Sequence, residues 1–235
     1  MATGDDPLLD NEPELARTMA ASVQQRIAFG ERAGEKVHHI GSGAALDGVL
    51  GLISGQDDIL GYLVDADRVV AAGSSFGGYT VLKLMEQDPR VLTGLPLVPA
   101  TAIPPRPDPC RISKSMMFMS GGLDSMVSYV ETENFYTRIP STAADHWYIL
   151  VHRAGHTFRN DCLPGFATLP CSEVLPQAKT NAIMAHWITA FFLRYVAGDQ
   201  HYSEFLEPTS VTDTDYVVLK TITGTTPGPM PAAVP

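Results

Sequence analysis

The feature that most constrains this chain is a serine flanked by glycines where a predicted strand meets a predicted helix. An apolar run, Val69 to Ala72, predicts a buried strand and leads into Gly73-Ser-Ser-Phe-Gly77, which fits G-x-S-x-G with Ser75 at its centre. The apolar residues from Tyr79 to Met85 predict the following helix. This is the context of a strained turn that exposes a nucleophilic hydroxyl, and we expect the two outer glycines to let strand and helix approach closely. The alternative is an ordinary turn rich in glycine and serine.

The rest of the chain predicts an α/β protein with a mostly parallel sheet flanked by helices. Apolar runs predict further strands at 91–98, 115–120 and 147–151, and helical patterns lie around 130–136 and 178–196. Strands that alternate with helices are typical of a parallel sheet covered on its faces.

Three segments organise the chain. Residues 1–43 are expected to form an N-terminal helical arm, because Leu15, Met19, Val23 and Ile27 give an apolar stripe at helical spacing. Residues 44–200 form the predicted α/β core, which the length of 235 residues allows as a single sizeable unit. Residues 201–235 are predicted to be a C-terminal extension that ends in a mobile tail, because 221–235 is rich in Thr, Pro, Gly and Ala.

Charge and hydropathy exclude several kinds of partner. A net charge of −10 with only 16 Lys plus Arg argues against nucleic acid or an anionic membrane surface as the main partner. No apolar run approaches the roughly 20 residues of a membrane-spanning helix. The polar, acidic N-terminus does not resemble a secretory signal.

Two further polar residues follow predicted strands and are expected near Ser75. Asp124 comes after the strand at 115–120, and His156 comes after the strand at 147–151. Because parallel strands end at one edge of a sheet, Ser75, Asp124 and His156 are expected to meet there. His156 would take the proton of Ser75, Asp124 would orient His156, and the backbone N–H of Phe76 would donate to the oxyanion.

Each of these residues has a competing interpretation. Asp124 could simply close its turn, and the carboxylates of Asp108, Asp145 and Asp161 are alternatives to it, although none directly follows a predicted strand. His156 could be a structural histidine. His152 lies four residues before it, but the segment is strand then loop with no Glu in the motif, so no metal site is expected.

The chain resembles α/β-hydrolases of the dienelactone-hydrolase and platelet-activating-factor-acetylhydrolase-like group, from about residue 44 to residue 196. The resemblance lies in Val64-Asp-Ala-Asp-Arg-Val-Val-Ala-Ala-Gly-Ser-Ser-Phe-Gly-Gly-Tyr-Thr80, Ser120-Gly-Gly-Leu-Asp124 and Ala154-Gly-His-Thr-Phe158, followed by Asp161-Cys162. It implies that nucleophile, acid and base are Ser75, Asp124 and His156. It also implies hydrolysis of carboxylic esters through an acyl-enzyme, without a cofactor.

The pairing of the cysteines would indicate whether the protein resides in an oxidising compartment. Cys162 and Cys171 lie nine positions apart and could form a disulfide or remain reduced thiols, and Cys110 is the third cysteine. The resemblance favours the Cys162–Cys171 pair, because a cysteine after the catalytic histidine is expected to pair with one downstream. A disulfide would favour a secreted or periplasmic protein; the localisation is otherwise unknown.

The chain departs from this family in two places. Ser74 stands where the family usually has His before the nucleophile. Only about 68 residues precede the elbow strand, so the fold is expected to be N-terminally reduced, with Ile40-Gly-Ser-Gly43 as a candidate loop for the second oxyanion donor. We expect the N-terminal helices to cover the resulting sheet edge, or two chains to pair there as a homodimer.

The leading functional hypothesis is a serine carboxylesterase that acts on small or medium acyl esters. Tyr79, Met126 and Phe158 are candidate residues of an apolar acyl pocket, with Trp147 as a further candidate, although core packing is their commoner role. Lactones, lipid esters and polyesters are alternative substrates. The runner-up is a truncated hydrolase fold that acts in binding or assembly with little turnover.

Overall fold

The described part of the chain forms a five-stranded sheet covered by helices. In the computed structural model the described residues are 65, 67–141, 144–158, 169–208 and 213–221, so the predicted arm of residues 1–43 lies outside them. The strands are β1 (Val69–Ser74), β2 (Val91–Leu97), β3 (Met116–Gly121), β4 (His146–Val151) and β5 (Tyr216–Thr221), in the order β1-β2-β3-β4-β5. The first four are parallel, and β5 is antiparallel to β4. The predicted α/β fold class is confirmed.

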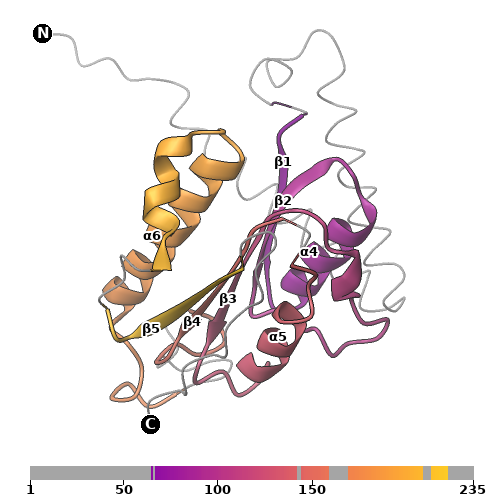
Figure 1. The fold of residues 1–235 in the computed structure, drawn as a ribbon. Helices are drawn as coiled ribbons and strands as arrows, with labels where there is room; N and C mark the ends of the chain where they lie inside the picture. Colours follow the sequence, from indigo (N-terminus) through magenta and orange to yellow (C-terminus); the bar gives the residue numbers. More distant parts are fainter. Residues whose placement is uncertain (1–64, 66, 142–143, 159–168, 209–212, 222–235) are drawn as a thin grey trace, which may run out of the picture. The chain divides into compact units, whose positions relative to one another are not determined.

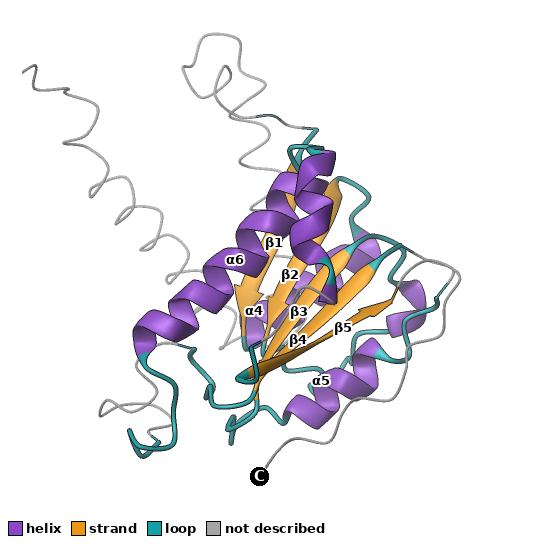
Figure 2. Cartoon of the chain, turned by 60° about the vertical axis from the view of Figure 1, so that its left-hand side comes forward, coloured by secondary structure: helices purple, strands orange, loops and turns teal. Residues whose placement is uncertain are grey.

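The helices form two layers, one on each face of the sheet (Figures 1 and 2). Helices α4 (Phe76–Gln87) and α5 (Tyr129–Tyr136) lie on one face, and α6 (Gln177–Tyr195) lies on the other. Short 3-10 helices, η1 (Pro109–Arg111) and η2 (Gln200–Leu206), lie in the connections. None of the helices in the described ranges is both long and apolar enough to cross a membrane.

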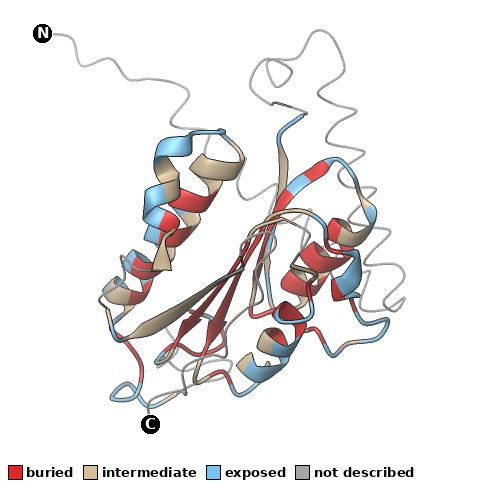
Figure 3. Ribbon diagram, viewed as in Figure 1, coloured by how far each residue is buried: buried red, intermediate tan, exposed pale blue. Residues whose placement is uncertain are grey.

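Strands β3 and β4 form the centre of the core because both of their faces are covered. All six residues of each strand are buried (Figure 3). Alternation sends Met117 and Trp147 into the core cluster that includes Trp187 and Phe191 of α6. On the other face, Phe118 packs against Phe135 of α5, with 6.0 Å between ring centroids. Continuous apolar runs therefore predicted these strands well.

Strand β5 was not predicted from the sequence. It pairs with β4 from Tyr216↔Val151 to Thr221↔His146, so the sheet continues beyond residue 200, where the predicted core ended. Its flanks explain the omission, since the strand directly precedes the Thr- and Pro-rich stretch interpreted as a tail. Residues 222–235 lie outside the described ranges.

The first outer glycine of the G-x-S-x-G motif is a packing requirement, whereas the second is not. A Cβ atom at Gly73 would lie 2.5 Å from the carbonyl oxygen of Gly77, so β1 and α4 meet backbone to backbone. A Cβ atom at Gly77 meets no described atom within 4 Å. Gly78 has the second close contact, because its Cβ would lie 2.9 Å from the carbonyl oxygen of Leu97. The expectation that both outer glycines allow the close approach is therefore corrected: Gly73 and Gly78 do so.

His146 is a buried histidine at the start of β4. It has 0% exposure, and neither ring nitrogen has a hydrogen-bond partner in the described part of the structure. Burial disfavours the imidazolium and lowers the pKa of His146 to about 4, while the nearby charge of Asp145 acts in the opposite direction. The fold therefore holds this side chain neutral.

Replacement of the two motif glycines should have different effects on stability. Gly73→Ala should destabilise the fold by about 1–3 kcal/mol, because the new methyl group meets a backbone carbonyl that cannot move alone. Gly77→Ala should leave stability unchanged or raise it by up to about 1 kcal/mol, because alanine favours the helix. Urea unfolding of both variants measures the difference, and equal losses would contradict the assignment.

His146 should make the protein less stable in mild acid. Its pKa is lower in the fold than in the unfolded chain, so its contribution is complete above about pH 6.5 and declines as the pH falls toward about 4. Between about pH 7.5 and pH 5 this costs about 2 kcal/mol of unfolding free energy. His146→Leu should reduce that loss in urea titrations at the two pH values. The control His201→Leu changes an exposed histidine and should retain it; the same loss in both variants would refute the assignment.

Candidate active site

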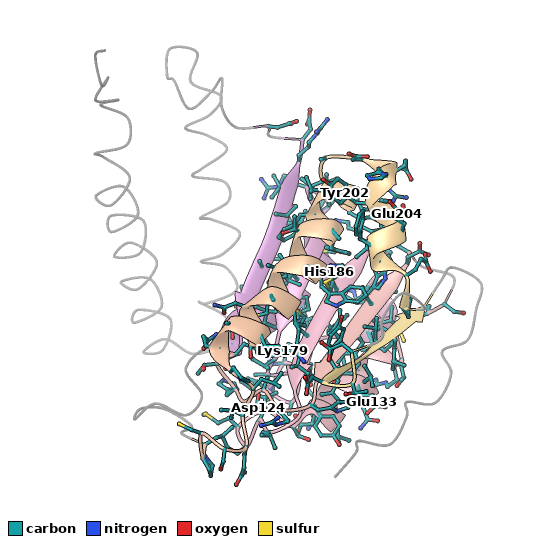
Figure 4. The ribbon with its side chains drawn as sticks, turned by 90° about the vertical axis from the view of Figure 1, so that its left-hand side faces the viewer. Asp124, Glu133, Lys179, His186, Tyr202 and Glu204 are labelled. Carbon is teal, nitrogen blue, oxygen red and sulfur yellow. The ribbon has the colours of Figure 1, made fainter. Side chains whose placement is uncertain are left out.

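The three residues of the predicted triad all lie at the carboxyl ends of parallel strands. Ser75 connects β1 to α4, Asp124 follows β3, and His156 follows β4. In Figure 4, Asp124 lies at the end of the sheet where α6 begins near Lys179, whereas Tyr202 and Glu204 lie at the other end. The fold thus brings residues distant in sequence to one edge, as expected for an open parallel sheet.

Ser75 has a strained backbone conformation that turns the chain sharply from strand to helix. Its φ of 57° and ψ of −116° lie in a region that non-glycine residues rarely adopt. Such a residue costs on the order of 1–3 kcal/mol and persists only where its surroundings fix it. Although Ser75 occupies the N-cap position of α4, its side chain caps no helix N–H. The hydroxyl is thus not used in the usual stabilising role of an N-cap serine.

Asp124 and His156 form a buried hydrogen-bonded pair. The His156 Nδ1 atom lies 2.8 Å from Asp124 Oδ2, and the two side chains are 5% and 0% exposed. The other oxygen, Oδ1, accepts hydrogen bonds from the N–H groups of Met126 at 2.8 Å and Val127 at 2.9 Å. These contacts fix the carboxylate on both sides, so it can orient the imidazole with Nε2 directed away from Asp124.

Backbone hydrogen bonds join the ends of neighbouring strands across this edge. The N–H of Ser75 donates to Leu97 O at 2.9 Å, and the N–H of Val98 donates to Met119 O at 2.8 Å. The N–H of Leu123 donates to Ala154 O at 3.0 Å. The loop that carries His156 therefore lies directly on the loop that carries Asp124.

Ser75 is not hydrogen-bonded to His156 in this structure. Within the described ranges the Ser75 hydroxyl has no hydrogen-bond partner, and the residue is partly buried. Catalytic hydrogen bonds are often loose in proteins without substrate and tighten on binding. The structure thus pairs two of the three predicted residues and holds the third at the same sheet edge.

Arg153 anchors the histidine loop, and the sequence analysis did not identify it. Its Nε donates to Glu173 O at 2.9 Å, and its Nη2 donates to Ser172 O at 3.1 Å and Val174 O at 3.2 Å. The N–H of Leu175 in turn donates to Arg153 O at 2.9 Å. Carbonyl acceptors leave no signature in side-chain identity, so no sequence signal could have revealed this anchor.

Phe76 lies where an oxyanion donor is expected. It is the first residue of α4, and the N–H groups of a first helical turn point toward the helix N-terminus, which favours negative charge. The proposed second donor loop, Ile40–Gly43, lies outside the described residues. Both donor roles stay predictions.

The candidate pocket residues differ in exposure. Tyr79 is 2% exposed, stacks on Phe76 and donates its hydroxyl to Pro105 O at 3.1 Å. Phe158 is 3% exposed and packs in the α6-side core, as does Trp147. Met126, at 49% exposure, is the most accessible of the four. Their contacts with a substrate stay predictions, and the observed contacts of Tyr79, Phe158 and Trp147 are core packing.

The competing carboxylates have other contacts. Asp108 caps η1 through the N–H of Cys110 at 3.0 Å, and Asp145 accepts a long hydrogen bond from Tyr195 at 3.5 Å. Asp161 lies outside the described residues. Among described residues, no group of three or more His, Cys, Asp or Glu side chains could hold a metal ion.

Of the two cysteines in the predicted disulfide, the described residues include Cys171 alone. Cys171 is disulfide-bonded, and Cys110 is free and exposed. Cys162 lies outside the described residues, so its pairing with Cys171 stays a prediction.

Comparison with known proteins does not assign the chain to a family. No protein-family profile and no curated protein matches the chain. The arrangement of Ser75, Asp124 and His156 therefore carries the functional argument by itself.

Proposed function

We propose that this protein is a serine carboxylesterase with an α/β-hydrolase fold that acts on small or medium acyl esters. The observation that carries the proposal is the strained Ser75 at a strand–helix turn, at the same sheet edge as the buried Asp124–His156 pair. The order of these residues along the chain, and the strands that they follow, agree with the α/β-hydrolase arrangement. The fold class alone supports many functions, so the proposal depends on this site.

The proposed reaction proceeds through an acyl-enzyme. The Ser75 hydroxyl attacks the ester carbonyl carbon while His156 Nε2 takes its proton, and the tetrahedral oxyanion is stabilised by the N–H of Phe76. His156 then gives the proton to the leaving alkoxide, so alcohol departs and the acyl group stays on Ser75. Water, activated by His156, releases the carboxylic acid and restores the serine.

A covalent probe tests the nucleophile. A fluorophosphonate should label the parent protein, and Ser75→Ala should abolish labelling because the attacking oxygen is absent. Ser74→Ala is the matched control, since Ser74 is the exposed neighbouring serine at the end of β1. Labelling that persists in Ser75→Ala would refute the assignment.

Loss of the acid should reduce turnover without removing the nucleophile. In Asp124→Asn, Oδ1 can still accept from Met126 and Val127, but the amide would hold His156 in the wrong tautomer. We expect kcat for p-nitrophenyl butyrate to fall roughly 10³- to 10⁴-fold. A change of less than tenfold would assign Asp124 a structural role.

The same assay separates the esterase from a fold that only binds. Ester hydrolysis that disappears in His156→Ala would exclude the non-catalytic alternative. Absence of hydrolysis in the parent protein, together with absence of fluorophosphonate labelling, would favour it.

A further inference from the structure

The loop that carries His156 is held, on the side away from Arg153, by the first residue of α6. The Nε2 atom of Gln177 donates to Phe158 O at 3.2 Å, two residues after the histidine. The same nitrogen donates to Asn181 Oδ1 at 2.7 Å, one turn further along the helix. An amide nitrogen has two N–H groups to donate, so both contacts can be made together and the side chain is fixed at two points.

Phe158 has a backbone conformation that depends on such a restraint. Its φ of 55° lies in the left-handed region, which bulky residues rarely adopt. Its side chain is 3% exposed and packs in the core cluster on the α6 side of the sheet. A strained conformation persists only where the surrounding structure fixes it. The core holds the ring of Phe158, and Gln177 holds the carbonyl group of the same residue.

His156 therefore lies in the middle of a span, residues 154–158, that is anchored near both ends. At one end, Ala154 O accepts a hydrogen bond from the N–H of Leu123 at 3.0 Å. At the other end, Phe158 O accepts from Gln177. Release of the second anchor would allow the strained φ to relax, and the backbone of the histidine would move with it.

The pair of His156 and Asp124 is sensitive to movement of this kind. Nδ1 of the histidine lies 2.8 Å from Oδ2, while the N–H groups of Met126 and Val127 hold the carboxylate in place. Because the carboxylate is fixed, displacement of the histidine loop must lengthen or tilt the hydrogen bond between them. A misplacement of about 1 Å in a catalytic group can cost on the order of 100-fold in rate.

From these contacts we infer that Gln177 is a positioning residue of the candidate active site. It acts through Phe158 to keep His156 aligned with Asp124, and it does not itself transfer protons. The inference rests on the proposed esterase function and adds to it a residue outside the triad. Figure 4 shows Lys179, in the same helical turn, at the end of the sheet where Asp124 lies.

Two variants remove the amide donor in different ways. Gln177→Leu removes it without adding a charge. Gln177→Glu keeps the shape of the side chain but offers only acceptors at neutral pH, and a negative charge in the first turn suits the N-terminus of α6, so the helix should stay folded. Gln200→Leu is the matched control, because Gln200 is an exposed glutamine that begins η2, whose residues Tyr202 and Glu204 lie at the other end of the sheet (Figure 4).

Both Gln177 variants should lose turnover and keep substrate binding. We expect kcat for p-nitrophenyl butyrate to fall about tenfold while KM changes by less than about twofold, because proton transfer depends on the alignment of His156 and ester binding does not. Gln200→Leu should keep both parent values. Urea unfolding gives the folded fraction of each variant, so kcat is compared per folded molecule. An unchanged kcat per folded molecule, or an equal loss in Gln200→Leu, overturns the inference.

The tautomer of His156 gives a second readout that needs no turnover. In protein with isotope-labelled histidine, nuclear magnetic resonance shows which ring nitrogen of the neutral imidazole carries the proton, and the signal missing from His156→Ala identifies the residue. Asp124 should keep the proton on Nδ1 in the parent protein and in Gln200→Leu. Both Gln177 variants should show a mixture of the two tautomers, because the hydrogen bond that selects one of them is weakened.

These spectra distinguish failure of the inference from failure of the esterase proposal. If the parent protein neither hydrolyses the ester nor reacts with a fluorophosphonate, the esterase proposal fails, and the tautomer of His156 still decides whether Gln177 positions it. Spectra of both Gln177 variants that match the parent spectrum overturn the inference, whatever the change in kcat.

Discussion

The row of backbone hydrogen bonds across the carboxyl edge of the sheet is the constraint on which the candidate site depends. It runs from Ser75 to Leu97, from Val98 to Met119 and from Leu123 to Ala154, so each strand end is tied to the next. These bonds join backbone atoms only, so they do not require particular side chains, whereas a change in strand register would break them. The positions of Ser75, Asp124 and His156 are therefore set by the sheet, and the loops between strands contribute the finer adjustments.

The backbone hydrogen bonds at this sheet edge explain how Ser75 can keep a strained conformation. A serine at φ 57° would relax if either the strand before it or the helix after it could move. Its N–H is fixed by Leu97, its carbonyl accepts from Tyr79 and Ala100, and Gly73 allows α4 to lie against β1. The free energy that stabilises the sheet edge thus offsets the cost of a conformation that leaves the serine hydroxyl uninvolved in helix capping.

Sequence patterns predicted much of this fold, and the failures have physical causes. Long apolar runs identified β3 and β4 because both faces of these strands are buried, and the strand-end rule selected Asp124 over Asp108 and Asp145. Strand β5 lies at an edge, where pairing with β4 decides the structure and local pattern is weak. The roles of Gly77 and Gly78 could not be separated, because the packing depends on where Leu97 and Pro99 lie in space. The sequence also could not reveal that Arg153 anchors the loop of His156, since Arg153 binds backbone carbonyls.

The segment after β2 has a backbone path that is fixed at several points, although many of its side chains are exposed. The loop of His156 is fixed by Arg153, and the turn of Asp124 is fixed by two N–H groups on its carboxylate. The segment after β2 is held at Pro105 by the Tyr79 hydroxyl and at the N–H of Asp108 by Glu86, while Arg106 between them stays exposed. Such a segment keeps its backbone path when its exposed side chains change. The exposed side chains of this segment can therefore differ in charge without disturbing the strained serine or the buried pair that the proposed chemistry requires.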